Sequence, residues 1–327
     1  MNFPGLVLFI ALLVAVEFTV FSWASHEKPE NKDDDANGPK SNKKDMVERC
    51  PLSPPTSSME MSALQNFSVN GQPPIFPAGN TVAICQTGEV PETGKVPIDD
   101  KFATLFQTNL GIPRYSIYAL DPDKVKAIVG SGVSRSATWH QTEGIALQGS
   151  NEMYSNQPGP VNAGSGLASF FYTNAVPQVD GFNMGQWKKY ELRIVKYAKE
   201  QCAPVGTLYL ITGISEISFS QASPTAPVQT TRQVMSQTFP SHVPTIINKI
   251  AIPNSMWTVG CCVDEGQVVL GAFAVFGNNL PKNDVLMQAN LRVTKAEQLI
   301  RDGANDQTIQ LFPGNAGCYA PANQYDL

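Results

Sequence analysis

Short apolar segments rich in β-branched and aromatic residues recur along this chain of 327 residues, and they constrain its fold more than any other feature. Gly, Pro or Asn bound each of them, and these residues interrupt strands and favour turns. We therefore predict the strands of a largely antiparallel sheet. The predicted strands are residues 81–86, 113–120, 166–176, 206–214, 256–263 and 267–277.

Two other segments show helical periodicity. Between about Gly185 and Gln201, apolar residues recur at the spacing of one helix face. Near the end of the chain, Thr294 and Glu297 have the spacing of a capping box, which predicts a short helix to about Arg301. Polar, proline-bearing residues 221–244 predict a long surface insertion. The whole pattern predicts one α+β domain in which helices flank the sheet.

The N-terminal residues predict export. An eleven-residue apolar run, Leu6 to Val16, precedes the small-residue site Ser22-Trp23-Ala24. A membrane span needs ~20 apolar residues, so residues 1–24 are predicted to be a signal peptide, with an uncleaved signal anchor as the alternative. Residues 25–49 are highly charged and predict a disordered linker, followed by a folded domain at 50–327.

The cysteines support an extracellular location. All six follow the predicted signal peptide, and an even number in a secreted chain favours three disulfides. They are Cys50, Cys85, Cys202, Cys261, Cys262 and Cys318. The sequence contains no C-x-x-C pair, the spacing typical of zinc ligands, so a zinc site is not predicted. Asn66 begins an N-x-S sequon, so we expect an N-linked glycan there.

The charge balance limits the possible partners. A net charge of −5 and an isoelectric point near 5.3 argue against binding nucleic acid by bulk positive charge. The predicted long helix nevertheless has a basic side, which suits either weak phosphate contacts or plain solvation. Its basic residues are Lys188, Lys189, Arg193, Lys196 and Lys199. We expect no stable membrane association, and the extracellular partner stays open.

The stretch from Tyr172 to Glu191 holds three candidate site residues. Asn174 and Asn183 lie nine residues apart, and Glu191 follows eight residues later. Eight residues of straight helix span ~12 Å, so Asn183 and Glu191 would cooperate only if Asn183 lay at a bend before the helix. An amide ligand with water completing the shell suits Mg²⁺. The structural alternative is that Asn174 holds a turn, Asn183 caps the helix and Glu191 is solvated.

The order of the segments resembles the DNA/RNA non-specific endonuclease family, which has a ββα-metal core. The likeness rests on TNAVPQ…FN.G.W…E at 173–191, LYLITG at 208–213 and IPNSMWTVGCC at 252–262. The blocks at 83–86, 101–120 and 309–318 resemble the family's secreted animal branch of endonuclease domain-containing proteins. The resemblance covers roughly Cys50 to Cys318.

The resemblance implies roles for individual residues. Asn183 corresponds to the direct ligand of Mg²⁺, with Mn²⁺ or Ca²⁺ as alternatives. Asn174 corresponds to a residue that supports the metal site, and Glu191 to the residue that holds a metal-bound water. Trp187 resembles the family's structural tryptophan. The secreted branch also has an early cysteine pair, which implies a Cys50–Cys85 bridge.

The family's catalytic motif is degenerate in this chain. The family has Asp-Arg-Gly-His, in which the His is the general base and the Arg supports the phosphate. Here the sequence reads Gln157-Pro158-Gly159-Pro160, and proline cannot accept or relay a proton. We therefore assign no catalytic residue, because Pro160 occupies the general-base position. His26, His140 and His242 lie in no motif that would replace the base.

Three functions remain open on this basis. The favoured one is a secreted, catalytically inactive pseudonuclease with a binding or extracellular-matrix role and a residual divalent-metal site. A weak Mg²⁺-dependent DNA/RNA endonuclease that uses Glu191 or Glu143 as its base is the alternative. The third is a matrix component whose metal residues are vestigial.

Overall fold

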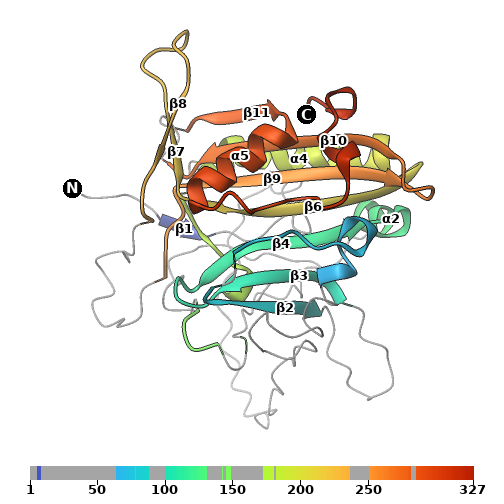
Figure 1. The fold of residues 1–327 in the computed structure, drawn as a ribbon, viewed down its shortest axis with the longest axis horizontal. Helices are drawn as coiled ribbons and strands as arrows, with labels where there is room; N and C mark the ends of the chain where they lie inside the picture. The colour runs from blue at the N-terminus through green and yellow to red at the C-terminus, as the bar shows by residue number, and fades with distance from the viewer. Residues whose placement is uncertain are drawn as a thin grey trace, which may run out of the picture.

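The computed structural model describes residues 6–8, 64–77, 79–87, 100–130, 142, 145–148, 172–179, 182–235, 250–280 and 285–327. Its centre is a seven-stranded sheet in the order β11-β10-β9-β6-β4-β3-β2. Every neighbouring pair in this sheet is antiparallel. The predicted α+β class with a mainly antiparallel sheet is confirmed (Figure 1).

Most of the predicted strands are confirmed within a few residues, because their apolar, β-branched composition suits a sheet that is covered on both faces. The sheet strands are β2 (Thr81–Thr87), β3 (Asp100–Gln107), β4 (Ile112–Leu120), β6 (Gly206–Ser215), β9 (Ser255–Asp264), β10 (Val269–Asn278) and β11 (Met287–Leu291). The prediction did not include β3 and β11.

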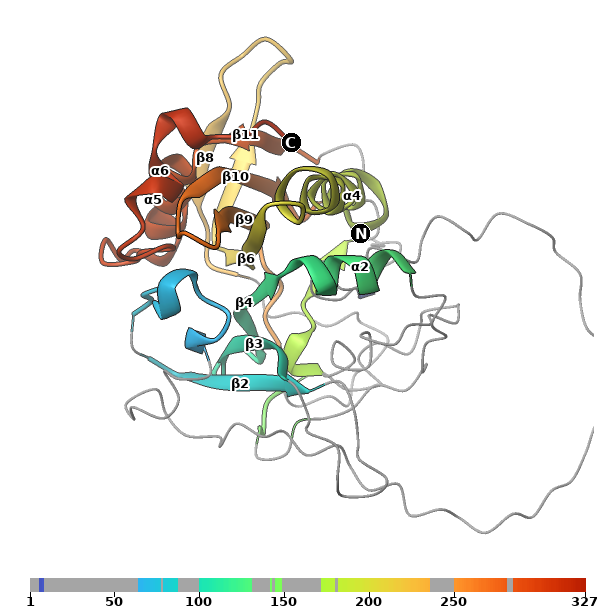
Figure 2. The same cartoon turned by 90° about the vertical axis from the view of Figure 1, so that its right-hand side faces the viewer.

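Helices cover both faces of the sheet. On one face lie α5 (Val293–Ala304) and α6 (Ala316–Tyr319), followed by the short helix η7 (Pro321–Asn323). On the other lie α2 (Pro122–Gly130) and α4 (Lys188–Tyr197) (Figure 2). The helical segments η5 (Phe182–Trp187) and η6 (Ala198–Cys202) extend α4 at its two ends. The predicted long helix is therefore confirmed.

A separate hydrophobic core forms on each face of the sheet. Alternate residues of β4 show the division: Tyr115, Ile117 and Ala119 join the core under α5, whereas Tyr118 and Leu120 join the core under α4. Successive side chains on a strand point to opposite faces, so a central strand such as β4 contributes to both cores. Near η5 a third apolar cluster contains Phe182 and Trp187.

Two local predictions are wrong. Tyr172–Asn174, which lie within the strand predicted at 166–176, form the short 3-10 helix η4, and the strand β5 (Pro177–Val179) follows it. The capping box at Thr294 is also absent: α5 begins at Val293, and its N-cap residue Arg292 makes no side-chain capping bond. Residues 166–171 lie outside the described residues.

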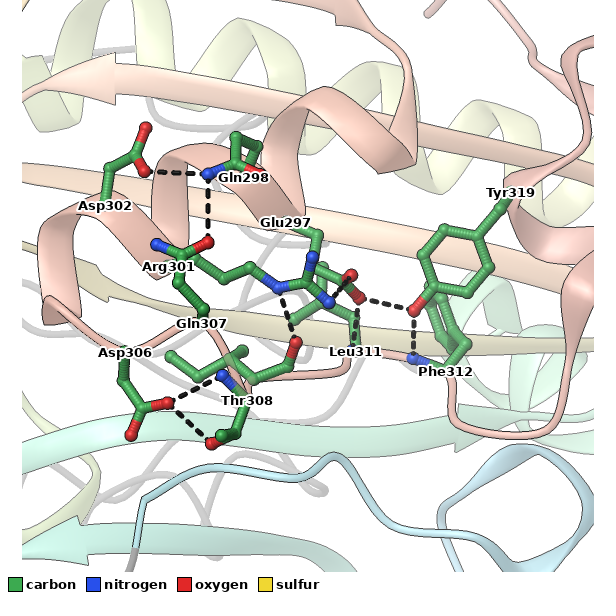
Figure 3. A network of polar contacts seen from close by, with 11 residues as sticks. Glu297, Gln298, Arg301, Asp302, Asp306, Gln307, Thr308, Leu311, Phe312 and Tyr319 are labelled. Carbon is green, nitrogen blue, oxygen red and sulfur yellow. Dashed lines mark hydrogen bonds and ion pairs between the residues drawn. The ribbon is translucent and has the colours of Figure 1, made fainter.

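Glu297, predicted to cap its own helix, instead ties α5 to the segment that follows. Its carboxylate accepts hydrogen bonds from the backbone N–H of Leu311, at 2.8 Å, and from the Tyr319 hydroxyl, and it pairs with Arg301 (Figure 3). Arg301 Nε also donates to the carbonyl of Ile309 at 2.8 Å. Glu297 therefore bonds to Leu311, Tyr319 and Arg301 instead of capping α5. These bonds are favoured because they satisfy the buried Leu311 N–H, which would otherwise lack an acceptor.

Two disulfides attach β9 to elements on opposite faces of the sheet. Cys262 bonds to Cys202 at the end of η6, and Cys261 bonds to Cys318 in α6. Neighbouring residues on a strand face opposite ways, so the Cys261-Cys262 pair reaches both helical layers. Cys85 is also disulfide-bonded, while Cys50, its predicted partner, lies outside the described residues.

Two smaller strand pairs lie outside the main sheet. Strand β1 (Leu6–Leu8) falls inside the predicted signal peptide and pairs antiparallel with β5. Strands β7 (Ile217–Ser220) and β8 (Gln229–Arg232) pair as a hairpin that projects from the body of the molecule (Figure 1). This hairpin forms part of the predicted surface insertion, and residues 236–244 of that prediction lie outside the described residues. A short helix, η2 (Val69–Gly71), precedes β2.

Candidate metal and nucleic-acid site

Asn174 is anchored to the sheet. The residue is 1% exposed, and it is the last residue of the 3-10 helix η4, which precedes β5. Its Oδ1 accepts hydrogen bonds from Ser116 Oγ at 2.9 Å and from Thr104 Oγ1 at 3.4 Å. Its side chain thus contacts the sheet instead of bridging a local turn, and the predicted turn-holding role is wrong.

Beneath Asn174 a row of hydroxyl side chains crosses four adjacent strands. Thr104 pairs in register with Ser116, Ser116 with Thr212, and Thr212 with Thr258. The hydroxyls bond across the strands at both ends of the row: Thr104 to Ser116 at 2.9 Å, and Thr212 to Thr258 at 2.7 Å. All four residues are at most 2% exposed. We call these four residues the hydroxyl row.

The hydroxyl row was not among the predicted site residues. Each member is a hydroxyl residue with no charged or amide neighbour on either side in its strand, as in LYLITG and MWTVGCC. These hydroxyl residues can be seen in the sequence, but the sequence does not show which of them lie next to each other in the sheet. Only the register of the sheet joins four strands into one polar feature between two apolar clusters.

A small cavity lies between Asn174 and the row. Ser116, Thr212 and Asn174 line it together with mainly apolar residues such as Val176, Ile214 and Met256, and its volume is about 10 Å³. Asn174 Nδ2 is buried and has no hydrogen-bond partner among the described residues.

Glu191 lies in the first turn of α4 and is half-buried. Desolvation raises the pKa of its carboxyl to about 7, although a hydrogen bond from Trp187 and the nearby charge of Lys188 oppose the rise. Trp187 is itself 2% exposed and packs against Phe182 with ring centroids 5.1 Å apart. The structural role predicted for Trp187 fits this position. The alternative of a solvated Glu191 is wrong.

Asn183 lies in η5, near the start of the helical segment, and is 7% exposed. Among the described residues no hydrogen bond to its side chain is found. Gly185 interrupts the helical geometry just after it, with φ −101° and ψ −110°. The predicted bend is therefore present, but it follows Asn183. Asn183 does not cap α4, because Trp187 occupies that position.

The structure brings two of the three predicted residues over one face of β4. Asn174 contacts Ser116, and the charge of Glu191 raises the pKa of the Tyr118 hydroxyl in addition to the larger effect of burial. Ser116 and Tyr118 are two residues apart, so they share a face. The Tyr118 hydroxyl lies 3.4 Å from Thr212 Oγ1 and links this area to the hydroxyl row. Within the described residues, no contact joins Asn183 to Asn174 or Glu191.

The donor set suits a divalent cation only in part. Asn183 and Glu191 offer oxygen atoms, which hard cations prefer. Asn174 does not fit as a ligand in this arrangement, because its oxygen already accepts two bonds from the sheet and an N–H group cannot ligate a metal. Across the described ranges no group of three or more His, Cys, Asp or Glu residues is placed to hold a metal ion.

The basic side of the long helix is exposed. Lys189, Arg193, Lys196 and Lys199 are exposed, and Lys188 is half-buried. Some of this charge has local partners: Arg193 lies over the Tyr190 ring at 5.0 Å, and Lys196 Nζ is 3.9 Å from Glu200. Pro158, Pro160, Glu143 and the three histidines lie outside the described residues.

Together these features define an α+β protein with a polar site between one face of its antiparallel sheet and a helix. A family model for DNA/RNA non-specific endonucleases matches residues 85–306, which is more than half of the chain. The chain belongs to the DNA/RNA non-specific endonuclease family, and the ββα-metal nuclease-like fold predicted from the sequence is confirmed.

This chain is similar, at 13% sequence identity, to a solved structure titled "Crystal structure of the EndoG/EndoGI complex: Mechanism of EndoG inhibition". The match covers 72% of this chain and 91% of that chain, with a TM-score of 0.46. No curated protein matches the chain. Within the described residues, no helix has the length and apolar character needed to cross a membrane.

Proposed function

We propose that this chain is a secreted pseudonuclease: a nuclease fold with a binding or matrix role, a residual divalent-metal site and negligible hydrolysis. One observation carries the proposal. Pro160 stands where the family's motif has its general base, and Pro158 where it has the phosphate-supporting arginine. Losing a positioned base costs about 10²–10⁴ in rate, and losing the arginine adds to that.

Asn183 and Glu191 would hold the metal, Asn183 through its amide oxygen and Glu191 through a water. A divalent cation bound there supplies positive charge that stabilises a phosphate. Asn174 positions the adjoining backbone through its bonds to the sheet. The exposed lysines of the long helix supply weak phosphate contacts if nucleic acid is the ligand. The disulfides suit an oxidising compartment, which supports the extracellular location.

A weak Mg²⁺-dependent endonuclease is the second candidate. The observation that favours it is the placement of Glu191, whose carboxyl lies over the same face of β4 as Asn174 and has a pKa of about 7. A carboxylate with a pKa near neutrality suits a general base. In that case Glu191 would take over the role of the missing histidine.

Plasmid nicking by the purified secreted chain, with Mg²⁺ and with EDTA, tests the proposal. We expect no nicking by the wild type. Nicking that requires Mg²⁺ and is lost in Glu191→Gln would overturn the pseudonuclease and support the second candidate. Changing Gln157→Asp, Pro158→Arg and Pro160→His together should restore more activity than Pro160→His alone, because both prolines also alter the backbone path.

Thermal unfolding with Mg²⁺ or Mn²⁺ tests the metal site. Binding confined to the folded state stabilises by about 2.7 kcal/mol at a hundredfold excess over Kd. We expect metal to raise Tm in the wild type and in Asn109→Ala, a change at an exposed turn, but not in Asn183→Ala. No shift at tens of millimolar metal would favour a matrix protein with vestigial metal residues.

A further inference from the structure

The hairpin of β7 and β8, together with the loop 221–228 that joins them, forms a projecting arm. Both views show it extending beyond the helices and the main sheet (Figure 1 and Figure 2). All four residues of β8 are exposed. The arm contributes nothing to the candidate metal site, so its sequence needs a separate explanation.

The base of the arm is firmly held. Ile217 and Phe219 of β7 are 2% and 4% exposed and pack in the core under α5. Asn278 bonds both backbone polar groups of Phe219, accepting from its N–H at 2.8 Å and donating to its carbonyl at 2.6 Å. Arg232 donates to the carbonyl of Gly303 at 2.9 Å and pairs with Glu216 at 2.7 Å. The arm is thus presented in a fixed direction.

The tip of the arm displays hydroxyl groups beside prolines. Its sequence from Gln221 to Val228 is QASPTAPV, in which Ser223 and Thr225 flank Pro224. A turn holds the tip: Ala226 N–H donates to the Ser223 carbonyl at 2.9 Å, and Gln221 Nε2 donates to the Ala226 carbonyl at 2.7 Å. The two hydroxyls are exposed and lie 3.4 Å apart. Among the described residues no other side chain binds them.

The arm also lacks the charges that normally protect such a surface. No charged residue lies between Glu216 and Arg232. Within the part of the chain that the structure describes, one side of β8 has no neighbouring strand, and exposed edges of this kind invite pairing with other chains. Proteins usually block such edges with charged side chains. Exposed serine and threonine residues beside proline are typical of O-glycosylated segments. Sugars attached there would shield the exposed strand edge in place of charged side chains.

We propose that the tip of this arm carries O-linked glycans, with Thr225 as the main acceptor and Ser223 as the second. The inference rests on the extracellular route included in the proposed function. The sugar donor is a nucleotide-activated N-acetylhexosamine, used by a glycosyltransferase of the secretory pathway. Thr225 Oγ1 bonds to the anomeric carbon, the bond from that carbon to the nucleoside diphosphate breaks, and the hydroxyl proton leaves to a base. No redox change occurs.

Mass spectrometry of the full chain, secreted by animal cells and freed of N-linked glycans, tests the proposal. We expect N-acetylhexosamine-based additions on the peptide that contains residues 221–228. The double variant Ser223→Ala/Thr225→Ala should lose these additions and keep the wild-type Tm, because both side chains are exposed. The matched control Thr294→Ala/Thr308→Ala changes two exposed threonines that have no proline neighbour, and it should keep the additions.

An arm peptide without added sugar overturns the proposal. The presence or absence of a glycan on Asn66 then distinguishes failure of the arm site from failure of the extracellular route. Asn66 is exposed in a turn and reports passage through the secretory pathway. A glycan at Asn66 with a bare arm would contradict the arm site alone, whereas a bare Asn66 and a bare arm would contradict the extracellular route as well. Additions that persist in the double variant would also overturn the assignment of Thr225 and Ser223.

Discussion

At the scale of single residues, Thr212 occupies a central position in the hydroxyl row. Its hydroxyl bonds Thr258 at 2.7 Å and lies 3.4 Å from the Tyr118 hydroxyl. Thr212→Val keeps the shape of the side chain but leaves Thr258 without this partner in a buried site. We expect the free energy of unfolding to fall by about 1–3 kcal/mol, measured by chemical denaturation.

A control substitution on the same strand distinguishes the stability effect of losing the Thr212–Thr258 hydrogen bond from the effect of replacing a threonine by valine in β6. Thr207→Val alters a half-buried threonine of β6, and it should change the free energy of unfolding by less than about 0.5 kcal/mol. The double variant Thr212→Val/Thr258→Val removes both partners, so its cost should be smaller than the sum of the single costs. Strict additivity would show that the two hydroxyls do not interact.

Glu191 makes stability depend on pH. Its pKa is about 7 in the folded chain against an ordinary value of 4.5, so the folded state holds the proton more tightly than the unfolded state. The free energy of unfolding therefore falls as pH rises from about 4.5 to about 7. Glu191→Gln mimics the protonated form, and we expect it to exceed the wild type by about 1–3 kcal/mol above pH 7, after allowance for its partial exposure.

Thermal unfolding from pH 4 to pH 8 measures this difference. The control Glu200→Gln changes an exposed glutamate on η6 and should follow the wild type at each pH. A constant offset between Glu191→Gln and the wild type across this range would contradict the raised pKa. If Glu191 also takes part in metal binding, Mg²⁺ should raise Tm more at pH 8 than at pH 6, because the ionised carboxylate is the form that attracts the cation.

At the scale of elements, α5 and the segment after it depend on Glu297. The residue is 6% exposed, and its carboxylate serves Arg301, Tyr319 and the Leu311 backbone at once (Figure 3). Removing the carboxylate leaves the buried Leu311 N–H and the partly buried Tyr319 hydroxyl without this acceptor, which costs about 1–3 kcal/mol, while Arg301 is partly exposed and can turn to solvent. We expect Glu297→Ala to lower the free energy of unfolding by that amount in chemical denaturation.

Gln298→Ala is the control for that variant. Gln298 follows Glu297 on α5 but faces solvent, where it bonds Asp302 at 2.8 Å. Its change should cost less than about 0.5 kcal/mol. Equal effects of the two changes would show that the helix tolerates losing its attachment to the C-terminal segment, and that the Glu297 contacts contribute little.

At the scale of the whole molecule, export and oxidation should leave chemical marks. We expect secreted protein to begin near Ser25, to carry a glycan on Asn66 and to show no free thiol when folded. None of the described cysteines is free. N-terminal sequencing, glycan mapping and thiol titration check the three marks. A chain that begins at Met1, or two or more free thiols, would contradict the predicted route.

The strands and the long helix could be predicted because their signals are local. A run such as residues 206–214 contains its own β-branched pattern and its own boundary glycine, and β6 differs from it by one residue. The capping box at Thr294 and Glu297 failed for the opposite reason. The spacing is correct, but Glu297 finds stronger partners in Leu311 and Tyr319, which lie in a later segment.

The sequence by itself predicted the family, which the family model confirms, and it predicts the loss of the catalytic pair, because both inferences depend on which residues occupy a motif. It also identified Asn174, Asn183 and Glu191 as the candidate site. Only the tertiary structure decided what these residues do: Asn174 binds the sheet, and desolvation gives Glu191 a pKa of about 7. The hydroxyl row and the disulfide pairing of β9 likewise needed the fold, because register and burial join residues that are far apart in the chain.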